Sequence, residues 1–304
     1  MKNKNALIIG LGSIGRKHFS ILKKLNLFKK VYTLSKQKEY KINKFTNLKK
    51  INLIHPSYIV ISSRTNLHFS QLKFLEKKIN NTLLLVEKPL FEKYRNFKVK
   101  NNLVFVGYNL RFHPVILFLK KFLKNKKIFN VNIVSKSYLP DWRKNIFYAK
   151  SNSAKKSFGG GALLELSHEL DYLQWIFGRV KSIEFAKLNK ISNLNIDCED
   201  SVLVIGKTNN ANFFLDLNFL SHRSERNILV EGDNFHIKAD LLKYKIEISR
   251  SNKIKTITFR KIKDQMYIDQ HRAIIKKKLK NLCSYSEGLD VLKVIKLIRK
   301  KNIQ

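Results

Sequence analysis

The chain of 304 residues contains few acidic residues. It has 22 Asp and Glu against 61 Lys and Arg, which gives a formal net charge of +39. An excess of this size is typical of proteins that bind nucleic acids or anionic membranes. However, five successive segments of 50 residues and a last one of 54 contain 14, 9, 10, 6, 7 and 15 basic residues, so no tail or stripe concentrates them. We interpret the charge as a lysine-rich surface, with nucleic-acid binding as the less favoured alternative.

Cysteine and long apolar segments are also scarce. The two cysteines, Cys198 and Cys283, are too few for a metal-ligand cluster and allow at most one disulfide, which favours a reducing cytosol. No apolar run approaches the ~18–20 residues that span a bilayer. An apolar stretch follows two lysines at the N-terminus, but glycines soon interrupt it and no cleavage signal of the A-x-A type follows. We therefore expect no export and a cytoplasmic location.

The residues that are present are sufficient for a packed core, because 44% are hydrophobic and 11% aromatic. Over residues 1–108, short apolar segments alternate with helical patterns, and we expect the strands at Asn5–Gly10, Val31–Leu34, Tyr58–Ser62, Thr82–Val86 and Leu103–Gly107. Strands that are apolar throughout are typical of a parallel sheet buried on both faces. The alternation predicts an α/β domain with a doubly wound parallel sheet of the Rossmann kind.

Residues 109–304 show a different pattern. A helix is expected at Pro114–Leu123, then a strand at Phe129–Tyr138, a polar loop that ends near Gly159, and one helix over Ala162–Phe177. Seven short strands with hairpin turns follow, and the chain is helical again from about Tyr267. This pattern predicts a second domain of the α+β class, with an open and mostly antiparallel sheet and C-terminal helices.

Residues Gly10 to Gly15 form a G-x-G-x-x-G motif between the first expected strand and helix, the context that dinucleotide binding requires. Gly10 permits a tight turn, Gly12 lets the backbone approach a pyrophosphate, and Gly15 allows close packing of helix and strand. The helix N-terminus, with Ser13 and Ile14, supplies the partial positive charge that binds phosphates.

The residue expected to bind the adenosine ribose lies about 20 positions after this motif. Ser35 stands there, followed by Lys36, and the next carboxylate is Glu39. A carboxylate ~4 Å from a 2′-phosphate would cost about 4 kcal/mol at an effective dielectric constant near 20. The absence of a carboxylate at this position, together with the presence of Lys36, favours NADP(H) over NAD(H).

Several further motifs follow in order along the chain. They are Ser63-Arg64-Thr65-Asn66-Leu67-His68, Glu87-Lys88-Pro89, the segment from Gly107 to Pro114, Leu139-Pro140-Asp141-Trp142-Arg143, and the segment from Gly159 to Asp171 with its triple glycine. Together they cover most of the chain, and the set resembles the Gfo/Idh/MocA oxidoreductases, which join a Rossmann domain to an open-sheet substrate domain. Within that family the chain is most similar to members associated with bacterial surface-sugar and nonulosonate pathways.

The resemblance implies catalytic residues. Lys88, in the Glu-Lys-Pro motif, is expected to lie near the nicotinamide and to act on a sugar hydroxyl. His168 matches the family's active-site histidine. The commoner family pattern has an Asp four residues before this histidine, whereas this chain has Glu165 three residues before it. Glu165 is therefore an expected catalytic acid whose transfer from the family is uncertain.

Binding residues follow from the same motifs. The expected coenzyme contacts are Gly10, Gly12, Ser13, Ile14, Gly15, Ser35, Lys36, Ser62, Thr65, Asn66, His68, Glu87 and Arg111. The expected substrate contacts are Asp141, Trp142, Arg143 and Tyr172. A ring such as that of Trp142 can stack on a sugar, and a guanidinium such as that of Arg143 can bind a carboxylate or phosphate.

The resulting prediction is an NAD(P)-dependent oxidoreductase that exchanges hydride with a secondary alcohol or ketone of a sugar or nucleotide sugar. No metal is expected, because a di-metal helical site would need a second Glu-x-x-His. The family also suggests a homo-oligomer that forms through the open sheet. Two alternatives remain: the same fold reducing a non-sugar imine or ketone, and a protein without enzymatic activity that binds a polyanion.

Overall fold

The computed structural model describes residues 4–35, 44–45, 47–143, 147–251 and 253–303. The chain divides into two compact units, one of Met1–Asn109 with Asp264–Leu289 and one of Leu110–Lys263 with Asp290–Gln304. The division into domains at residues 108 and 109 stays a prediction. It placed the whole C-terminal part in the second domain, whereas Asp264–Leu289 packs with the first unit.

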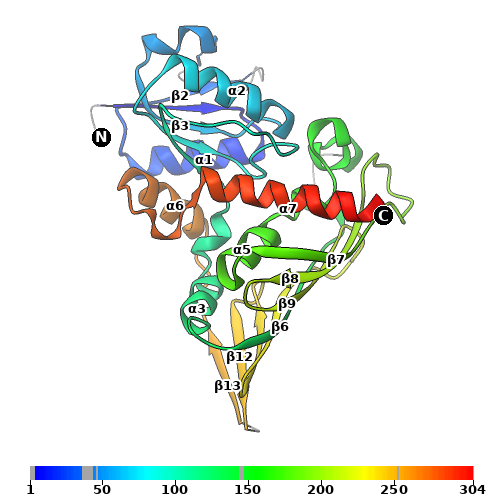
Figure 1. The fold of residues 1–304 in the computed structure, drawn as a ribbon. Helices are drawn as coiled ribbons and strands as arrows, with labels where there is room; N and C mark the ends of the chain where they lie inside the picture. Colours follow the sequence, from blue (N-terminus) through cyan, green and yellow to red (C-terminus); the bar gives the residue numbers. More distant parts are fainter. Residues whose placement is uncertain (1–3, 36–43, 46, 144–146, 252, 304) are drawn as a thin grey trace. The chain divides into compact units, whose positions relative to one another are not determined.

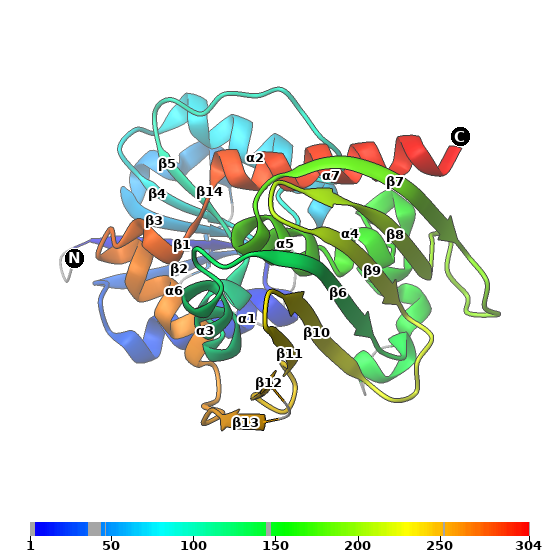
Figure 2. The same ribbon diagram turned by 60° about the horizontal axis from the view of Figure 1, so that its bottom comes forward.

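The first unit (Figure 1) contains a six-stranded sheet in the order β14-β5-β4-β3-β1-β2, whose strands are labelled in Figure 2. Its strands and helices, in chain order, are β1 (Asn5–Ile9), α1 (Ser13–Leu25), β2 (Lys30–Leu34), β3 (Pro56–Ile61), α2 (Thr65–Lys78), β4 (Leu83–Val86) and β5 (Leu103–Val106). The pairings from β2 through β5 are all parallel. The predicted parallel, doubly wound sheet is confirmed.

The parallel sheet has a switch point between β1 and β3. From β1 the chain adds β2 on one side, and it then returns to add β3, β4 and β5 on the other. An open α/β sheet binds ligands outside the carboxyl ends of its strands at such a point. The residues that directly follow these strand ends are Gly10, Ser62, Glu87 and Gly107.

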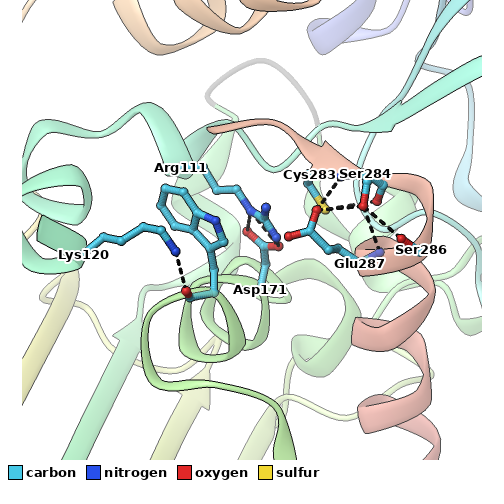
Figure 3. Close-up of polar contacts among 8 residues, drawn as sticks. Arg111, Lys120, Asp171, Cys283, Ser284, Ser286 and Glu287 are labelled. Carbon is cyan, nitrogen blue, oxygen red and sulfur yellow. Dashed lines mark hydrogen bonds and ion pairs between the residues drawn. The ribbon is translucent and has the colours of Figure 1, made fainter. Parts of the chain in front are cut away.

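A late segment of the chain completes this unit. Helix α6 (Gln265–Ile275) packs on α1, and the short strand β14 (Cys283–Ser284) pairs antiparallel with β5. The next helix, α7 (Tyr285–Ile303), begins with a capping box in which the Ser284 N–H donates to Glu287 Oε2 at 2.8 Å and the Glu287 N–H donates to Ser284 Oγ at 3.3 Å (Figure 3). Pairing with β5 therefore fixes where α7 begins.

The second unit contains an eight-stranded sheet in the order β13-β12-β11-β10-β6-β9-β8-β7 (Figure 2). Helix α3 (Pro114–Phe122) precedes the strands, which are β6 (Ile128–Lys136), β7 (Val180–Asn189), β8 (Ser201–Thr208), β9 (Asn212–Asn218), β10 (Glu225–Gly232), β11 (Phe235–Asp240), β12 (Lys245–Arg250) and β13 (Lys253–Thr258). All neighbours pair antiparallel except β6 and β9. The predicted open, mostly antiparallel sheet is also confirmed.

The single helix predicted over Ala162–Phe177 is wrong, because the structure has two helices there. Helix α4 (Ala162–Glu165) ends at Leu166, and α5 (His168–Phe177) begins after Ser167. Leu166 has φ −96° and ψ 29°, which is not helical. The apolar spacing continues across this break, which explains why the sequence pattern does not reveal it. Within the part of the chain that the structure describes, no helix has the length and apolar character to cross a membrane.

Candidate functional site

Two glycines of the Gly10–Gly15 motif are required by the packing of the protein itself. Gly10 has φ +92°, and a Cβ there would lie 2.6 Å from the Cα atom of Ser63. A Cβ on Gly15 would lie 1.9 Å from the Gly10 carbonyl oxygen. These two positions bring the start of α1 close to the ends of β1 and β3.

Gly12 has no such explanation. A Cβ at this position would meet nothing within 4 Å, and its φ of −65° is open to any residue. Gly12 is the N-cap of α1, whose first turn contains no acidic residue, and neither Gly12 nor Ser13 is buried. The first N–H groups of a helix need acceptors, and an anion is a favourable one. Gly12 thus leaves open space where a phosphate group fits, beside the half-buried Ile14.

The end of β2 adjoins this turn. The Gly10 N–H donates to the Leu34 carbonyl at 2.9 Å, so the following residue, Ser35, lies close to the glycine motif along the sheet edge. Lys36 lies outside the described residues.

The loop after β3 is bonded to the same turn. Ser62 Oγ donates to the Gly10 carbonyl at 2.9 Å, and its side chain is buried. Thr65 and Asn66 follow at the start of α2 and are half-buried.

His68 joins this loop to the loop after β4. Its Nδ1 lies 3.2 Å from the Pro89 carbonyl oxygen and its Nε2 lies 3.1 Å from the Ser63 carbonyl oxygen. Burial lowers the pKa of His68, which is 1% exposed. The ring therefore favours the neutral form, whose one N–H donates to one of these two carbonyls while the other nitrogen packs against the second. The contact of His68 with a coenzyme stays a prediction.

Glu87 and Lys88 follow β4 directly. Glu87 is 7% exposed, and its Oε2 accepts from the Lys88 backbone N–H at 3.3 Å. Gly107, at the end of β5, makes room for this carboxylate, because a Cβ there would lie 2.7 Å from Glu87 Oε1. Lys88 is half-buried. The motif thus combines a carboxylate in a tightly enclosed position with a lysine at the carboxyl edge of the sheet.

In the second unit, Glu165 and His168 lie on different helices. Glu165 ends α4, and its Oε1 accepts from Ser153 Oγ at 2.9 Å. His168 is the first residue of α5 and is 9% exposed. The one helix predicted over Ala162–Phe177 would have continued through both, but the chain turns at Leu166 and Ser167 between them. The catalytic roles of both residues remain predictions.

Tyr172 lies inside the second unit. It is 0% exposed, and its hydroxyl donates to Glu169 Oε1 at 3.5 Å. Glu169 is also fully buried and accepts from Arg226 Nε at 2.8 Å. The pKa of Tyr172 is raised well above its usual value, first by burial and then by Glu169. This geometry gives Tyr172 a role in packing, and the substrate contact predicted for it has no support from its surroundings.

Arg111, predicted to frame the coenzyme crevice, forms a buried ion pair (Figure 3). Its Nε and Nη2 donate to the Asp171 carboxylate at 3.0 and 2.7 Å, and the two side chains are 3% and 1% exposed. The guanidinium also lies 5.0 Å from the centre of the Trp175 ring, which Lys120 covers at 4.0 Å. Arg111 therefore ties the segment before α3 to α5, and a coenzyme contact for it stays a prediction.

Two residues of the triple glycine at 159–161 are required by the packing around them. A Cβ on Gly160 would lie 2.6 Å from the Ser153 carbonyl oxygen, and one on Gly161 would lie 2.5 Å from Glu199 Oε1. Glu199 in turn accepts from the Leu163 N–H at 3.2 Å, near the start of α4. These two glycines therefore leave room for the Ser153 carbonyl and the Glu199 carboxyl group.

Asp141, Trp142 and Arg143 follow β6. Asp141 is exposed, and Arg143 is half-buried. The Trp142 Nε1–H donates to Ser137 Oγ at 2.9 Å, and its ring packs edge-to-face on Phe219 with centres 5.1 Å apart. The tryptophan is thus anchored within its own unit, and its stacking on a sugar stays a prediction.

Sequence reasoning missed a group of buried polar residues in the first unit. His18, Tyr58 and His271 are fully buried and hydrogen-bonded to one another and to Glu87. His18 lies only three positions after Gly15, but nothing in the sequence pattern connects it with His271, which is 253 positions away.

A family model identifies part of the chain. Residues 116–238 match the GFO/IDH/MocA C-terminal domain. No curated protein matches the sequence. The family match and the shared fold confirm the resemblance to the Gfo/Idh/MocA oxidoreductases that the motifs indicate.

Solved structures share the fold at low sequence identity. The WlbA dehydrogenase of Bordetella pertussis, solved with NADH and UDP-GlcNAcA, has a TM-score of 0.80 and 18% identity over 99% of this chain and 97% of its own. A levoglucosan dehydrogenase solved with NADH has a TM-score of 0.85 and 16% identity, with the same coverage. The UDP-N-acetylglucosamine 3-dehydrogenase GnnA of Acidithiobacillus ferrooxidans has a TM-score of 0.79 and 14% identity over the full length of both chains. At these identities the likeness establishes the fold.

Proposed function

We propose that this chain, whose second unit carries the GFO/IDH/MocA C-terminal domain, is a nicotinamide-dependent oxidoreductase that acts on a secondary alcohol or ketone of a sugar. The observation that carries the proposal is the carboxyl edge of the first sheet. There the open position at Gly12 follows the end of β1 and the Glu87–Lys88 pair follows the end of β4, with β3 between these two strands of one sheet. A phosphate-binding turn and a general acid or base on the same edge are what hydride exchange with an alcohol requires.

The residues at this edge fit a dinucleotide. Gly12 would accept the pyrophosphate at the N-terminus of α1, and Ser62, Thr65 and Asn66 would border the coenzyme along the next strand end. A bound nicotinamide ring supplies or takes up the hydride. The protein's part is to hold the reacting carbon close to the ring and to move one proton.

Lys88 would move that proton at the sugar oxygen. It is half-buried at the end of β4, and the Glu87 carboxylate beside it accepts from its backbone N–H. A lysine amine within hydrogen-bond reach of the sugar oxygen can act as the general acid or base for this proton. His168 is the second candidate for this role, and Glu165 would act with it.

We propose a slight preference for NADP(H) over NAD(H). The support is the sequence Ser35-Lys36, which offers no carboxylate against a 2′-phosphate and one lysine that attracts it. WlbA and levoglucosan dehydrogenase were solved with NADH, so a measured comparison of the two coenzymes decides the matter. Equal kcat/KM with both would remove this preference.

The proposed substrate is a nucleotide sugar, and a free sugar is the alternative. WlbA was solved with UDP-GlcNAcA, and the charge of +39 favours a substrate that bears phosphates. Arg143, half-buried after β6, is a candidate for binding a phosphate or carboxylate of this substrate. The two cysteines are free and buried, which supports a reducing compartment such as the cytoplasm.

We further propose that the open sheet of the second unit pairs with another copy. Phe185, Ile205 and Phe214 are aligned neighbours on β7, β8 and β9, and they are 46%, 38% and 43% exposed. A row of exposed apolar side chains across three strands is typical of a contact surface. Phe214→Lys should convert an oligomer to monomers in sedimentation velocity, whereas Leu53→Lys, at an exposed apolar position of the first unit, should not. A wild-type monomer would contradict this assembly.

The test of the function has two steps. Titration of the protein into NADH and NADPH, followed by nucleotide fluorescence, should detect binding. Turnover is then sought with UDP-N-acetylglucosamine, UDP-GlcNAcA, levoglucosan and a non-sugar ketone. Binding of neither nucleotide, together with salt-sensitive binding of DNA, would overturn the proposal in favour of a polyanion-binding protein.

A further inference from the structure

Four buried side chains of the first unit form a continuous hydrogen-bonded chain. Tyr58 Oη lies 2.7 Å from His271 Nδ1, His271 Nε2 lies 2.9 Å from His18 Nδ1, and His18 Nε2 lies 2.9 Å from Glu87 Oε1. The first three residues are 0% exposed and Glu87 is 7% exposed. They come from β3, α6, α1 and the end of β4, so the chain of contacts crosses four elements; α1 and α6 lie side by side (Figure 1).

The Tyr58 end determines the direction of the hydrogen bonds. Among the described residues, His271 Nδ1 is the one hydrogen-bond partner of the Tyr58 hydroxyl, so the buried O–H donates to it. Burial raises the pKa of Tyr58 well above its usual value, which keeps this proton in place.

The proton positions on the two imidazoles follow. Burial, and then the neighbouring His18, lower the pKa of His271 well below its usual value, so this ring is neutral. Its Nδ1 accepts from Tyr58, and its Nε2–H therefore donates to His18 Nδ1. His18 then carries its proton on Nε2 and donates it to Glu87. Three donors in series thus end on one carboxylate.

In the described part of the chain, the further titratable groups in contact around these rings include Tyr267, Lys17 and Asp264. Tyr267 of α6 packs edge-on against His18 with ring centres 5.6 Å apart, and Lys17 lies over the Tyr267 ring at 5.0 Å. Lys17 is itself paired with Asp264 at 3.1 Å. Phe28 stacks on Tyr58 on the side of β3. Apart from Glu87, the surroundings of the two imidazoles are thus largely aromatic.

At its other end this series of hydrogen bonds fixes the Glu87 carboxylate beside Lys88. His18 holds Glu87 Oε1, the bare backbone of Gly107 leaves it just enough space, and Glu87 Oε2 accepts from the Lys88 N–H. A carboxylate held by a buried donor on one oxygen and a backbone N–H on the other stays in one orientation. Its orientation acts directly on the backbone of Lys88.

We propose that Tyr58, His271 and His18 form a positioning relay that holds Glu87 as an oriented carboxylate beside Lys88. Helix α6, remote in sequence, thereby takes part in placing the lysine that moves the proton. The proposal rests on the proposed function. The three residues are positioning residues, because they act on Lys88 through Glu87.

The first experiment reads the protons directly and needs no activity. Nitrogen-15 NMR of protein labelled at histidine, assigned with His18→Gln and His271→Gln, should show both rings as neutral Nε2–H tautomers at pH 7. An imidazolium signal for His18, or a proton on Nδ1 of His271, would overturn the relay.

The second experiment measures positioning. Tyr58→Phe removes the terminal donor and keeps the ring, and it should lower kcat about tenfold with little change in the KM of the coenzyme. A fall in kcat at an unchanged KM separates lost positioning from a general structural defect. Tyr285→Phe is the matched control: it removes a hydroxyl that donates to the Phe97 carbonyl at 2.9 Å in the same unit, and it should leave both kcat and KM unchanged.

A pair of substitutions at His271 covers the risk of misfolding. His271→Gln keeps a donor and an acceptor and should retain most of the activity, whereas His271→Leu should show the full loss of kcat expected for Tyr58→Phe. Thermal unfolding and NADH binding verify that each variant is folded. Tyr58→Phe and His271→Leu variants that bind the coenzyme but keep the wild-type kcat would refute the positioning role alone. A wild-type protein that binds no nicotinamide nucleotide would refute the proposed function, and the positioning role with it.

Discussion

The two sheets of this protein bury their strands differently, and the difference determines where polar side chains gather. In the first unit, β4 is buried at every residue, and β1 and β3 nearly so. In the second unit, β8 alternates between buried and exposed residues. Parallel strands all end at one edge, so Gly10, Ser62, Glu87 and Gly107 collect there, whereas antiparallel strand ends alternate between two edges.

This comparison explains why the candidate residues of the second unit come from outside its sheet. Glu165 and His168 lie on α4 and α5, and Trp142 lies in the segment after β6. The sheet itself supplies buried support, such as Arg226 of β10 for Glu169. The candidate residues of the first unit are thus brought together by the topology of its sheet, and Glu165 and His168 of the second unit by the two helices α4 and α5.

The largest effect is expected at the strand end of the first sheet. Lys88→Ala should lower kcat by about 10²- to 10⁴-fold, because a positioned acid or base contributes that much. Coenzyme binding, measured by nucleotide fluorescence, should stay within a factor of two or three of wild type. Lys93→Ala, at an exposed lysine five residues later, is the control and should have no effect. An active Lys88→Ala variant would show that a residue other than Lys88 transfers the proton.

In the second unit the corresponding large effect is on stability. Arg111→Met leaves the buried Asp171 without its partner and should lower the free energy of unfolding by about 3–5 kcal/mol. Asp171→Leu combined with Arg111→Met should recover part of this loss. Arg179→Met is the control, because Arg179 is 80% exposed and its pair with Asp290 is expected to contribute under about 1 kcal/mol. Urea unfolding measures all three, and equal losses for Arg111→Met and Arg179→Met would contradict the buried role.

An acid-sensitive contribution is expected from His113 in the second unit. Burial, with the charges of Arg226 and Lys261, lowers the pKa of His113 to about 4. Since the unfolded chain takes up this proton near pH 6.5, the folded state loses stability as the pH falls from about 6.5 to 4, by about 3 kcal/mol in total. His113→Asn keeps an acceptor for the Val115 N–H and should flatten the urea stability curve over that range. Parallel stability curves for the variant and the wild type would contradict this assignment. His68 and His271, whose pKa values are also lowered, contribute the same part of the dependence of stability on pH in both proteins.

The smallest expected effects separate two glycines of one motif. Gly15→Ala brings a Cβ against the Gly10 carbonyl and should cost about 1–3 kcal/mol of stability. Gly12→Ala meets open space and should change stability by less than about 0.5 kcal/mol, while weakening coenzyme binding about tenfold or more. Thermal unfolding and nucleotide titration of the two variants provide the comparison. A Gly12→Ala variant with unchanged affinity would argue against a phosphate at this turn.

Local patterns sufficed for much of this protein. Apolar β-branched runs predicted the strands of the first unit, because a strand buried on both faces has no polar alternation to obscure it. The motif at Gly10–Gly15 and the Glu87-Lys88-Pro89 segment were found for a similar reason, since each is contiguous in sequence. The break between α4 and α5 was not predictable, because the apolar spacing continues through Leu166 and Ser167 while the backbone turns.

The sequence by itself determined the two classes of sheet, the glycine-rich turn after β1 and the lysine at a strand end, because periodicity and short spacings are local properties. Tertiary structure alone decided which polar groups meet: His18 with His271, Arg111 with Asp171, and Gly161 with Glu199. It also decided that Tyr172 is interior and that α6 belongs with the first sheet. Such pairs come together because the fold buries them and each needs a hydrogen-bond partner there, and that requirement leaves no repeating signal along the chain.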